Sequence, residues 1–396
     1  MPGALPGFFY YFSPLLLLSL RPLFPRHCLY SGFGSCIQIG GFFMRRNKTH
    51  NRFWQQSVVL ASLLLFFALL MMGCGAHNGQ SAGADKAKEK PEIVFGDFSW
   101  DSVQVHNRIA AFIIEHGYGY PVNFMFGETI PILQGLERGD VDVSMEIWVD
   151  NIREAYQKAL DSGAVKDLGT NFPDAPQGWY VPTYVIKGDP ARGIKPMAPD
   201  LKSVSDLPRY WKLFKDPEQP NKGRFYNSPP GWVVTGINTQ KLKAYGLDKY
   251  FNDFITGSDT ALATSIVSAY EQGKPWLGYY WEPTWVMGKL DMTMLEEPPY
   301  SEKRWNTDRG CAFPACKVTI AINSKLEKVA PEVVKFLDNY QTTLEQTNKT
   351  LAYMHDHGVD AKAAAIWFLK QYPDHWKQWI PEDIAVRVSQ ALNEVK

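Results

Sequence analysis

Short apolar runs alternate with amphipathic stretches from Pro91 onward, and this alternation constrains the fold more than any other feature of the sequence. The first expected strands are 92–97, 121–126 and 141–147, and the helices between and after them are 101–116, 129–138 and 151–162. Gly117 and Gly139 stand where the first two helices need a C-cap. Strands that alternate with helices in this way predict βαβ units and a largely parallel sheet.

A second α/β block begins with an expected strand at 179–186 and resumes after a loop-like connection over 187–222. Its further expected elements are strands at 223–227 and 276–281 and helices at 233–245 and 259–272. A last strand at 317–323 leads into helical segments that run to Lys396. This order predicts an α/β protein of two lobes in which the chain returns to its first lobe, with lobe 1 over 91–185, lobe 2 over 186–298 and the return over 299–396.

The balance of charge argues against nucleic acid or anionic lipid as a partner. The 396 residues contain 41 basic and 41 acidic side chains, and the estimated pI is near 7.1, so no global field favours a polyanion. With 45 % apolar residues the chain can bury a large core.

The N-terminal region has the layout of an export signal. The uncharged apolar run 57–73 follows several basic residues and ends in Leu-Met-Met-Gly-Cys74, which resembles a bacterial lipoprotein cleavage box. We therefore expect a signal peptide over 44–73, acylation of Cys74 and a flexible tether over 74–90. The alternative is a single transmembrane anchor, and either reading places the rest outside the cytoplasm. Translation of residues 1–43 is doubtful, because a start at Met44 would give a conventional signal peptide. The alternative is that residues 1–43 contain an extra membrane segment.

Two cysteines, Cys311 and Cys316, remain after the leader and Cys74 are set aside. In an oxidising compartment we expect them to form a local disulfide, with a metal or redox role as the alternative. His355 and His357 are expected to be solvated rather than metal ligands, because positions two apart diverge on a helix. We expect no cofactor.

Aromatic side chains gather where the expected strands end. Trp100 and Trp148 each close an apolar run, Trp179 opens one, and Trp281 ends another. The carboxyl ends of strands point into the ligand crevice of α/β proteins, so these indoles predict a cage of ring faces. Such a cage suits a quaternary ammonium cation, which cannot donate hydrogen bonds.

The order of several motifs resembles the glycine betaine and choline substrate-binding proteins of ABC importers, over about residues 91–340. The motifs are Leu136-Glu-Arg-Gly-Asp-Val-Asp-Val before Trp148, Ser228-Pro-Pro-Gly-Trp before a helix, and Tyr280-Trp-Glu-Pro-Thr-Trp. The resemblance implies a two-lobed, periplasmic-binding-protein-like fold of type II with an interlobe ligand cleft. It also implies a cage of Trp100, Trp148 and Trp281, with Trp179 or Tyr180 as a fourth ring.

The polar end of the ligand needs donors rather than rings. Gly231 and Trp232 precede a helix, so their backbone N–H groups can face a carboxylate, and Thr284 can add a hydroxyl. If the ligand is choline, Asp101 or Glu146 can accept from its hydroxyl. Two positions depart from the family pattern: Thr284 replaces a common His, and Asp101 follows Trp100 at once rather than two residues later.

These features predict a non-enzymatic, extracytoplasmic, membrane-anchored receptor. It would capture glycine betaine, or alternatively choline, carnitine or proline betaine, and deliver it to an ABC permease with its ATPase. A competing reading is an extracellular carbohydrate-binding or hydrolysing lipoprotein that uses Glu146, Glu282 and Asp101 as acid and base. A third hypothesis is a surface lipoprotein with a purely structural role. Such a role would not explain why indole side chains gather at the strand ends.

Overall fold

The computed structural model describes residues 90–395 and contains ten strands there. The strands are β1 Ile93–Asp97, β2 Val122–Phe126, β3 Val143–Trp148, β4 Val165–Ala175, β5 Gln177–Pro182, β6 Gly223–Asn227, β7 Phe251–Ile255, β8 Gly278–Trp281, β9 Met292–Met294 and β10 Cys316–Asn323. The expectations for residues 1–89, including the signal and Cys74, lie outside this range.

Fifteen α-helices connect and follow these strands in the described range. They are α2 Asp101–Ile113, α3 Thr129–Arg138, α4 Arg153–Asp161, α5 Thr183–Lys187, α6 Leu207–Tyr210, α7 Val233–Ala244, α8 Asp259–Glu271, α9 Trp285–Lys289, α10 Glu302–Trp305, α11 Leu326–Val329, α12 Pro331–Asn339, α13 Leu344–His357, α14 Ala361–Gln371, α15 Pro373–Trp376 and α16 Glu382–Glu394. No helix among residues 90–395 is long and apolar enough to cross a membrane.

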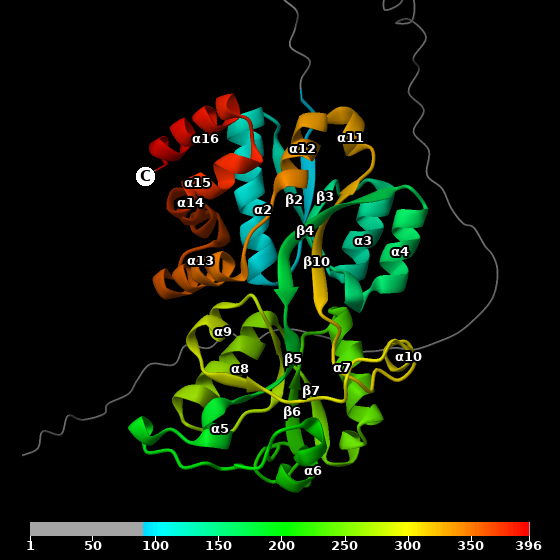
Figure 1. Cartoon of the computed structure of the whole chain (residues 1–396), viewed down its shortest axis with the longest axis vertical. Helices are drawn as coiled ribbons and strands as arrows, with labels where there is room; N and C mark the ends of the chain where they lie inside the picture. The colour runs from blue at the N-terminus through cyan, green and yellow to red at the C-terminus, as the bar shows by residue number, and fades with distance from the viewer. Residues whose placement is uncertain (1–89, 396) are drawn as a thin grey trace, which may run out of the picture. The chain divides into compact units, whose positions relative to one another are not determined.

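Two five-stranded sheets form the cores of two lobes (Figure 1). In the first sheet, with the order β2-β1-β3-β10-β4, β1 runs parallel to β2 and β3, and β10 runs antiparallel to β3 and β4. In the second, with the order β7-β6-β8-β5-β9, β6 runs parallel to β7 and β8, and β5 runs antiparallel to β8 and β9. Each sheet therefore has three mutually parallel strands, followed by one strand that runs antiparallel to both of its neighbours. This arrangement confirms the prediction of a two-lobed α/β protein.

The parallel strands are joined by helices because a parallel connection must cross back over the sheet. α2 connects β1 to β2, and α3 connects β2 to β3. Gly139 ends α3 with a φ of 84°, a left-handed conformation that glycine adopts without strain, so the C-cap expected there forms. The C-terminal helices α13, α14 and α16 return to the first lobe, where α14 packs along α2 (Figure 1).

The chain crosses between the lobes earlier than the sequence indicated. β5 pairs with β8 and β9 of the second sheet, so the crossing lies between Ala175 and Gln177 rather than at residue 185. The reason is that β4 and β5 form one nearly continuous extended segment, in which only Pro176 separates the two sheets. The helix α5 also occupies part of the strand expected at 179–186.

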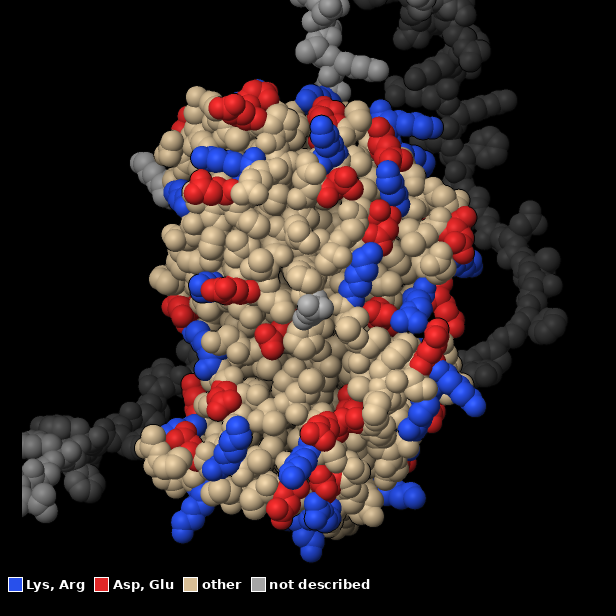
Figure 2. All heavy atoms as spheres, in the orientation of Figure 1, with Lys and Arg blue, Asp and Glu red and all other residues tan. Residues whose placement is uncertain are grey.

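Charged side chains of both signs are mixed on the face of the molecule seen in Figure 2. Basic and acidic residues are interspersed there over both lobes. This distribution agrees with the equal numbers of basic and acidic residues in the sequence.

Candidate functional site

A pocket lies between the two lobes at the ends of β1, β3 and β8, beside the start of α7. Its remaining walls include Glu146, Asn151 and Val234. Six aromatic residues line it: Phe98, Trp100, Trp148, Trp232, Tyr279 and Trp281. We call these six rings the aromatic cage.

The rings support one another in a chain that passes from one lobe to the other. Trp100 stacks on Phe98 with centroids 4.5 Å apart, and its ring meets Trp232 edge-on at 5.4 Å. Trp232 in turn meets Trp281 edge-on at 5.0 Å. Tyr279 lies nearly parallel to Trp281 at 5.9 Å, with 17° between the ring planes. Because each of these five rings packs against a neighbouring ring, their faces are held in fixed directions.

Trp232 also makes a polar link between the lobes. Its indole Nε1 donates to the Ser99 hydroxyl, 2.8 Å away, directly before the cage residue Trp100. The preceding residue, Gly231, has a φ of 94°, and a Cβ placed there would stand 2.7 Å from the Cγ of Glu128 in the other lobe. Glycine is therefore needed at 231 for the backbone conformation and for the close approach of the lobes.

Glu146 supplies a buried carboxyl group at the base of the cage, with 1 % of the residue exposed. Its Oε2 accepts from the indole Nε1 of Trp100 at 2.8 Å and of Trp148 at 3.3 Å. Its Oε1 is buried and has no hydrogen-bond partner among the described residues, and the nearest basic atom, Nε2 of His106, is 3.9 Å away. Desolvation raises the pKa of Glu146 to about 7, against the opposing effect of the hydrogen bonds that it accepts.

The buried His106 does not act as a fixed cation beside this carboxyl group. Burial lowers the pKa of His106 to about 3, so the ring is neutral at pH 7. Its Nδ1 lies 2.8 Å from the Tyr340 hydroxyl. Glu146 is therefore the group in the pocket wall that titrates near neutral pH.

The structure brings together the three indoles that were first expected to meet. Trp100 is the N-cap of α2, just after β1, whereas Trp148 and Trp281 end β3 and β8. The three residues are far apart in the sequence, and all line the same interlobe pocket. Their role in ligand binding stays a proposal.

Trp179 and Tyr180 do not line the pocket, so the structure does not support them as a fourth ring. Trp179 is fully buried, donates from Nε1 to Asn238 at 2.8 Å and packs on Phe225 at 4.4 Å. Tyr180 is 4 % exposed and pairs with Gly278 in the sheet. Because β5 runs antiparallel to β8, these residues lie within the lobe core rather than at a strand end that faces the cleft.

The residues expected to bind the polar end of the ligand lie in two different pockets. Trp232 lines the pocket as a ring, and the amides of α7 begin directly after it. Thr284 caps α9, where its hydroxyl accepts from the backbone N–H of Met287 at 3.2 Å. Thr284 and Asp101 line a neighbouring hollow on the other side of Trp281 rather than the cage itself.

Sequence reasoning missed Phe98 and Tyr279 as cage walls. Both stand two residues before a cage tryptophan. Tyr279 and Trp281 share one face of β8, and Phe98 stacks on Trp100 in the bend after β1. The same spacing relates Glu146 to Trp148. An i, i+2 search around each strand-end indole would have found these residues.

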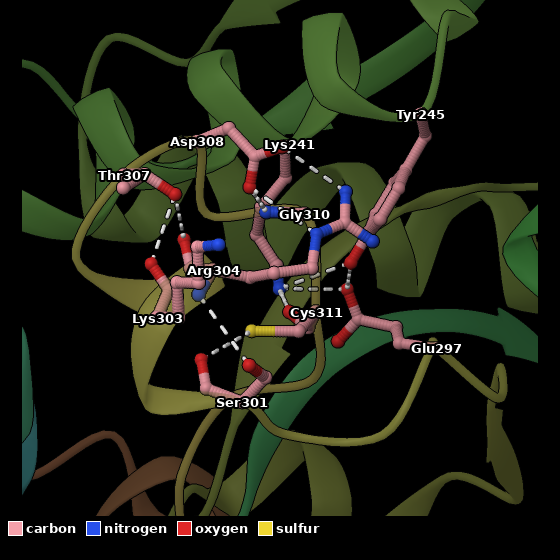
Figure 3. Close-up of polar contacts among 10 residues, drawn as sticks. All are labelled: Lys241, Tyr245, Glu297, Ser301, Lys303, Arg304, Thr307, Asp308, Gly310 and Cys311. Atoms are coloured by element: carbon pink, nitrogen blue, oxygen red, sulfur yellow. Dashed lines mark hydrogen bonds and ion pairs between the residues drawn. The ribbon is translucent and has the colours of Figure 1, made fainter.

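The expected disulfide is not present, because Cys311 and Cys316 are both free and buried. The Sγ of Cys311 lies 3.6 Å from the carbonyl oxygen of Ser301, as Figure 3 shows. Cys316 opens β10, where it pairs with Ala175. The two thiols are thus held against different neighbours, and burial raises the pKa of Cys316 to about 12, which disfavours the reactive thiolate.

Comparisons with known proteins agree with this architecture. Residues 91–371 match the family described as the substrate binding domain of ABC-type glycine betaine transport system. The chain is 25 % identical to a trimethylamine N-oxide-binding protein of Pelagibacter ubique (strain HTCC1062), over 83 % of this chain and 98 % of the relative. It is 24 % identical to a glycine betaine/proline betaine-binding periplasmic protein of Escherichia coli (strain K12), over 46 % of this chain and 58 % of the relative.

A solved structure supports the fold alone. The crystal structure of a glycine/betaine/L-proline-binding protein of an ABC transporter from Borrelia burgdorferi is 18 % identical to this chain. It superposes with a TM-score of 0.61 and covers 75 % of this chain and 99 % of the other.

Proposed function

The chain belongs to the family of substrate-binding domains of ABC-type glycine betaine transport systems, and from this premise we propose that it captures glycine betaine in the interlobe pocket and delivers it to a membrane permease. The family consists of binding proteins, so the chain is not an enzyme. The hydrolytic reading of Glu146, Glu282 and Asp101 is thereby set aside. The observation that carries the proposal is the convergence of aromatic rings from both lobes on one pocket.

The cage suits a trimethylammonium group because that group spreads its charge over methyl groups and has no N–H to donate. A ring face attracts such a cation with about 0.5 to 2 kcal/mol, the upper value applying where water is excluded. Trp100 and Trp281 are 6 % and 4 % exposed, so water is largely excluded from these rings. Several rings acting together support binding in the roughly micromolar range after the costs of association.

The carboxylate of glycine betaine has a separate place at the start of α7. The first amides of a helix lack intrahelical acceptors, and Val233 and Val234 at this end line the pocket. An anion there also meets the positive end of the helix dipole. Trimethylamine N-oxide is a second candidate, since the Pelagibacter relative that bears this name aligns over nearly its whole length.

A titration panel tests the proposal and separates these ligands. Purified protein beginning at residue 91 is titrated with glycine betaine, proline betaine, choline, carnitine and trimethylamine N-oxide, and tryptophan fluorescence and melting temperature are followed. We expect glycine betaine to change the fluorescence and to raise the melting temperature as its concentration exceeds Kd. An oligosaccharide is titrated in parallel; a response to it alone, or no response to any compound of the panel, would contradict the proposal.

We also propose that the receptor acts outside the cytoplasm, held to the membrane by a lipid on Cys74. This proposal is supported by the apolar run 57–73 and the Gly-Cys pair that follows it. The Escherichia coli relative is named a periplasmic protein. One lipid-anchored receptor near its permease would raise the local concentration of ligand-loaded protein.

A further inference from the structure

Two helices of different lobes meet beside the ligand pocket without taking part in it. The ring of Trp285, at the start of α9, stacks on the imidazole of His355 in α13, with centroids 3.5 Å apart and 18° between the planes. Lys289, at the end of α9, forms an ion pair with Asp356 and lies 3.4 Å from Nδ1 of His355. We call these four residues the clasp.

The two halves of the clasp belong to different lobes. α9 lies between β8 and β9, which are strands of the second sheet. α13 packs against α2 and α14 of the first lobe, and it also contacts α9, which lies next to it in Figure 1. In the described chain the lobes are joined covalently at Pro176 and through the segment between Met294 and Cys316. Any other contact between them is free to break when the lobes separate.

The clasp is next to the cage in sequence but does not line it. Trp281 and Trp285 come from the same Tyr-Trp-Glu-Pro-Thr-Trp segment, and only Trp281 lines the aromatic pocket. Trp285 instead walls a separate hollow with Asp101 and Asp259. The clasp therefore contributes to contact between the lobes and not to contact with the ligand.

We propose that the Trp285–His355 stack, with its flanking ion pair, holds the two lobes shut and thereby sets how fast the ligand leaves. This inference rests on the proposed function, because it needs a ligand that is enclosed by lobe closure. A contact that exists only in the closed form raises the closed fraction, and apparent affinity follows that fraction. The residues of the clasp are positioning residues, since none lines the aromatic pocket.

The two parts of the clasp are expected to contribute unequally. The side chains of Lys289 and Asp356 are 30 % and 49 % exposed, and ion pairs at such exposure contribute little. The aromatic stack is independent of salt screening and covers the face of Trp285. Removing either ring should therefore have the larger effect, and removing Lys289 the smaller one.

The test compares ligand exchange in Trp285→Ala, His355→Ala and the unaltered protein by stopped-flow fluorescence. Because the loss of one aromatic pair changes the closed fraction by a limited factor, we expect the dissociation rate to rise about 5- to 10-fold. The association rate should stay within about twofold, since affinity differences between related complexes lie mostly in dissociation. Lys289→Ala should raise the dissociation rate by less than either ring variant.

A matched control is present on the same helix. Tyr353 of α13 stacks on Trp367 of α14 at 4.7 Å and 14°, entirely within the first lobe. Tyr353→Ala should lower the melting temperature and leave the dissociation rate unchanged. The proposal is overturned if both ring variants exchange ligand at the unaltered rate, or if Tyr353→Ala accelerates exchange to the same extent.

A measurement without ligand tests the clasp independently of the proposed function. If no compound in the panel binds, the proposed function fails, and the clasp is judged by small-angle scattering of the ligand-free proteins. Trp285→Ala should then have a larger radius of gyration than Tyr353→Ala and the unaltered protein. Equal radii for all three proteins would overturn the clasp.

Discussion

At the residue scale, the pocket is built from pairs of side chains two positions apart. Glu146 with Trp148 in β3, and Tyr279 with Trp281 in β8, each place two groups on one side of a strand, and Phe98 stacks on Trp100 in the bend after β1. One member of each pair supports or orients its neighbour. The indoles were predictable because they stand at strand ends, but their supports were not, since an isolated Phe or Tyr also suits a core.

Two tryptophans that the sequence offered as cage rings should respond differently to substitution. Trp281→Ala removes a cage ring, and we expect at least tenfold weaker ligand binding with little loss of fold, because each desolvated ring contributes up to about 2 kcal/mol. Trp179→Phe leaves Asn238 without its donor in the core, so it should cost about 1 to 3 kcal/mol of unfolding free energy and leave affinity unchanged. Titration and urea unfolding of both variants check this; unchanged affinity in Trp281→Ala would count against the cage.

Glu146 should make ligand binding depend on pH. Its pKa is raised to about 7 in the ligand-free pocket, and a bound cation favours the ionised form, so binding releases a proton. Affinity should rise with pH, by up to about tenfold per unit below pH 7, and level off above it. Glu146→Gln should flatten this profile. Calorimetry in buffers of different ionisation enthalpy counts the protons, and zero release at pH 6 would exclude the coupling.

The same carboxyl group affects stability with the opposite trend. A folded-state pKa above the unfolded value of about 4.5 means that the folded protein binds more protons than the unfolded chain between pH 4.5 and 7. The contribution of Glu146 to stability is therefore fully present below pH 4.5 and is lost as pH rises through 7. Urea unfolding of the ligand-free protein should show this loss, and Glu146→Gln should remove it.

At the element scale, α7 connects the pocket to the returning crossover. Its start lines the cage, and near its end the fully buried Lys241 pairs with Glu297 at 2.8 Å, where Tyr245 also donates to Glu297 at 2.9 Å (Figure 3). Lys241 further donates to the carbonyl of Cys311. This cluster holds the segment that leaves the second lobe against α7, so within this crossover we expect bending at the residues nearer β10.

Breaking this buried pair from one side should destabilise the protein strongly. Lys241→Met leaves Glu297, which is 5 % exposed as a side chain, as a buried charge without its cation, at a cost of about 3 to 5 kcal/mol. The double variant Lys241→Met with Glu297→Leu should recover most of that loss because no charge stays unpaired. Urea unfolding of the single and double variants measures the difference; equal destabilisation in both would contradict this account.

Secondary structure was predictable where a periodic pattern of apolar residues was long and ended at capping or turn residues. Strands β1, β2, β3 and β6 and helices α3, α7 and α8 lie within a few residues of their expected bounds. β4, β7 and β9 were missed. β4 contains Gly169 and Pro173, and β9 is three residues long, so neither has the alternating apolar pattern by which strands are recognised. Their pairing is decided by neighbouring strands that sequence alone does not place.

At the scale of the whole molecule, the order of lobes was predictable and their boundary was not. Alternating elements and the return of the last strand indicate two lobes, whereas the crossing at Pro176 falls inside one extended run. The contact between α9 and α13 depends on how the two lobes pack against each other. This packing cannot be predicted from the sequence pattern of either helix. The disulfide expectation failed for a related reason, since nearness in sequence does not align two thiols.

The proposed anchor makes a prediction for the full-length chain. Cys74→Ser should release the receptor from the membrane fraction into the soluble extracytoplasmic fraction, because the lipid is attached through that thiol. Detergent phase partitioning of the full-length protein and the variant measures this, with ligand affinity as the control that should not change. Equal membrane retention of both proteins would indicate that the apolar run itself stays in the bilayer.

Gly231 has a consequence for the whole transport cycle. Any larger residue there would act as a wedge against Glu128, and it would also strain the backbone at a φ of 94°. The two lobes would then be unable to approach fully. We therefore expect Gly231→Ala to give a protein that does not close around its ligand and does not support transport.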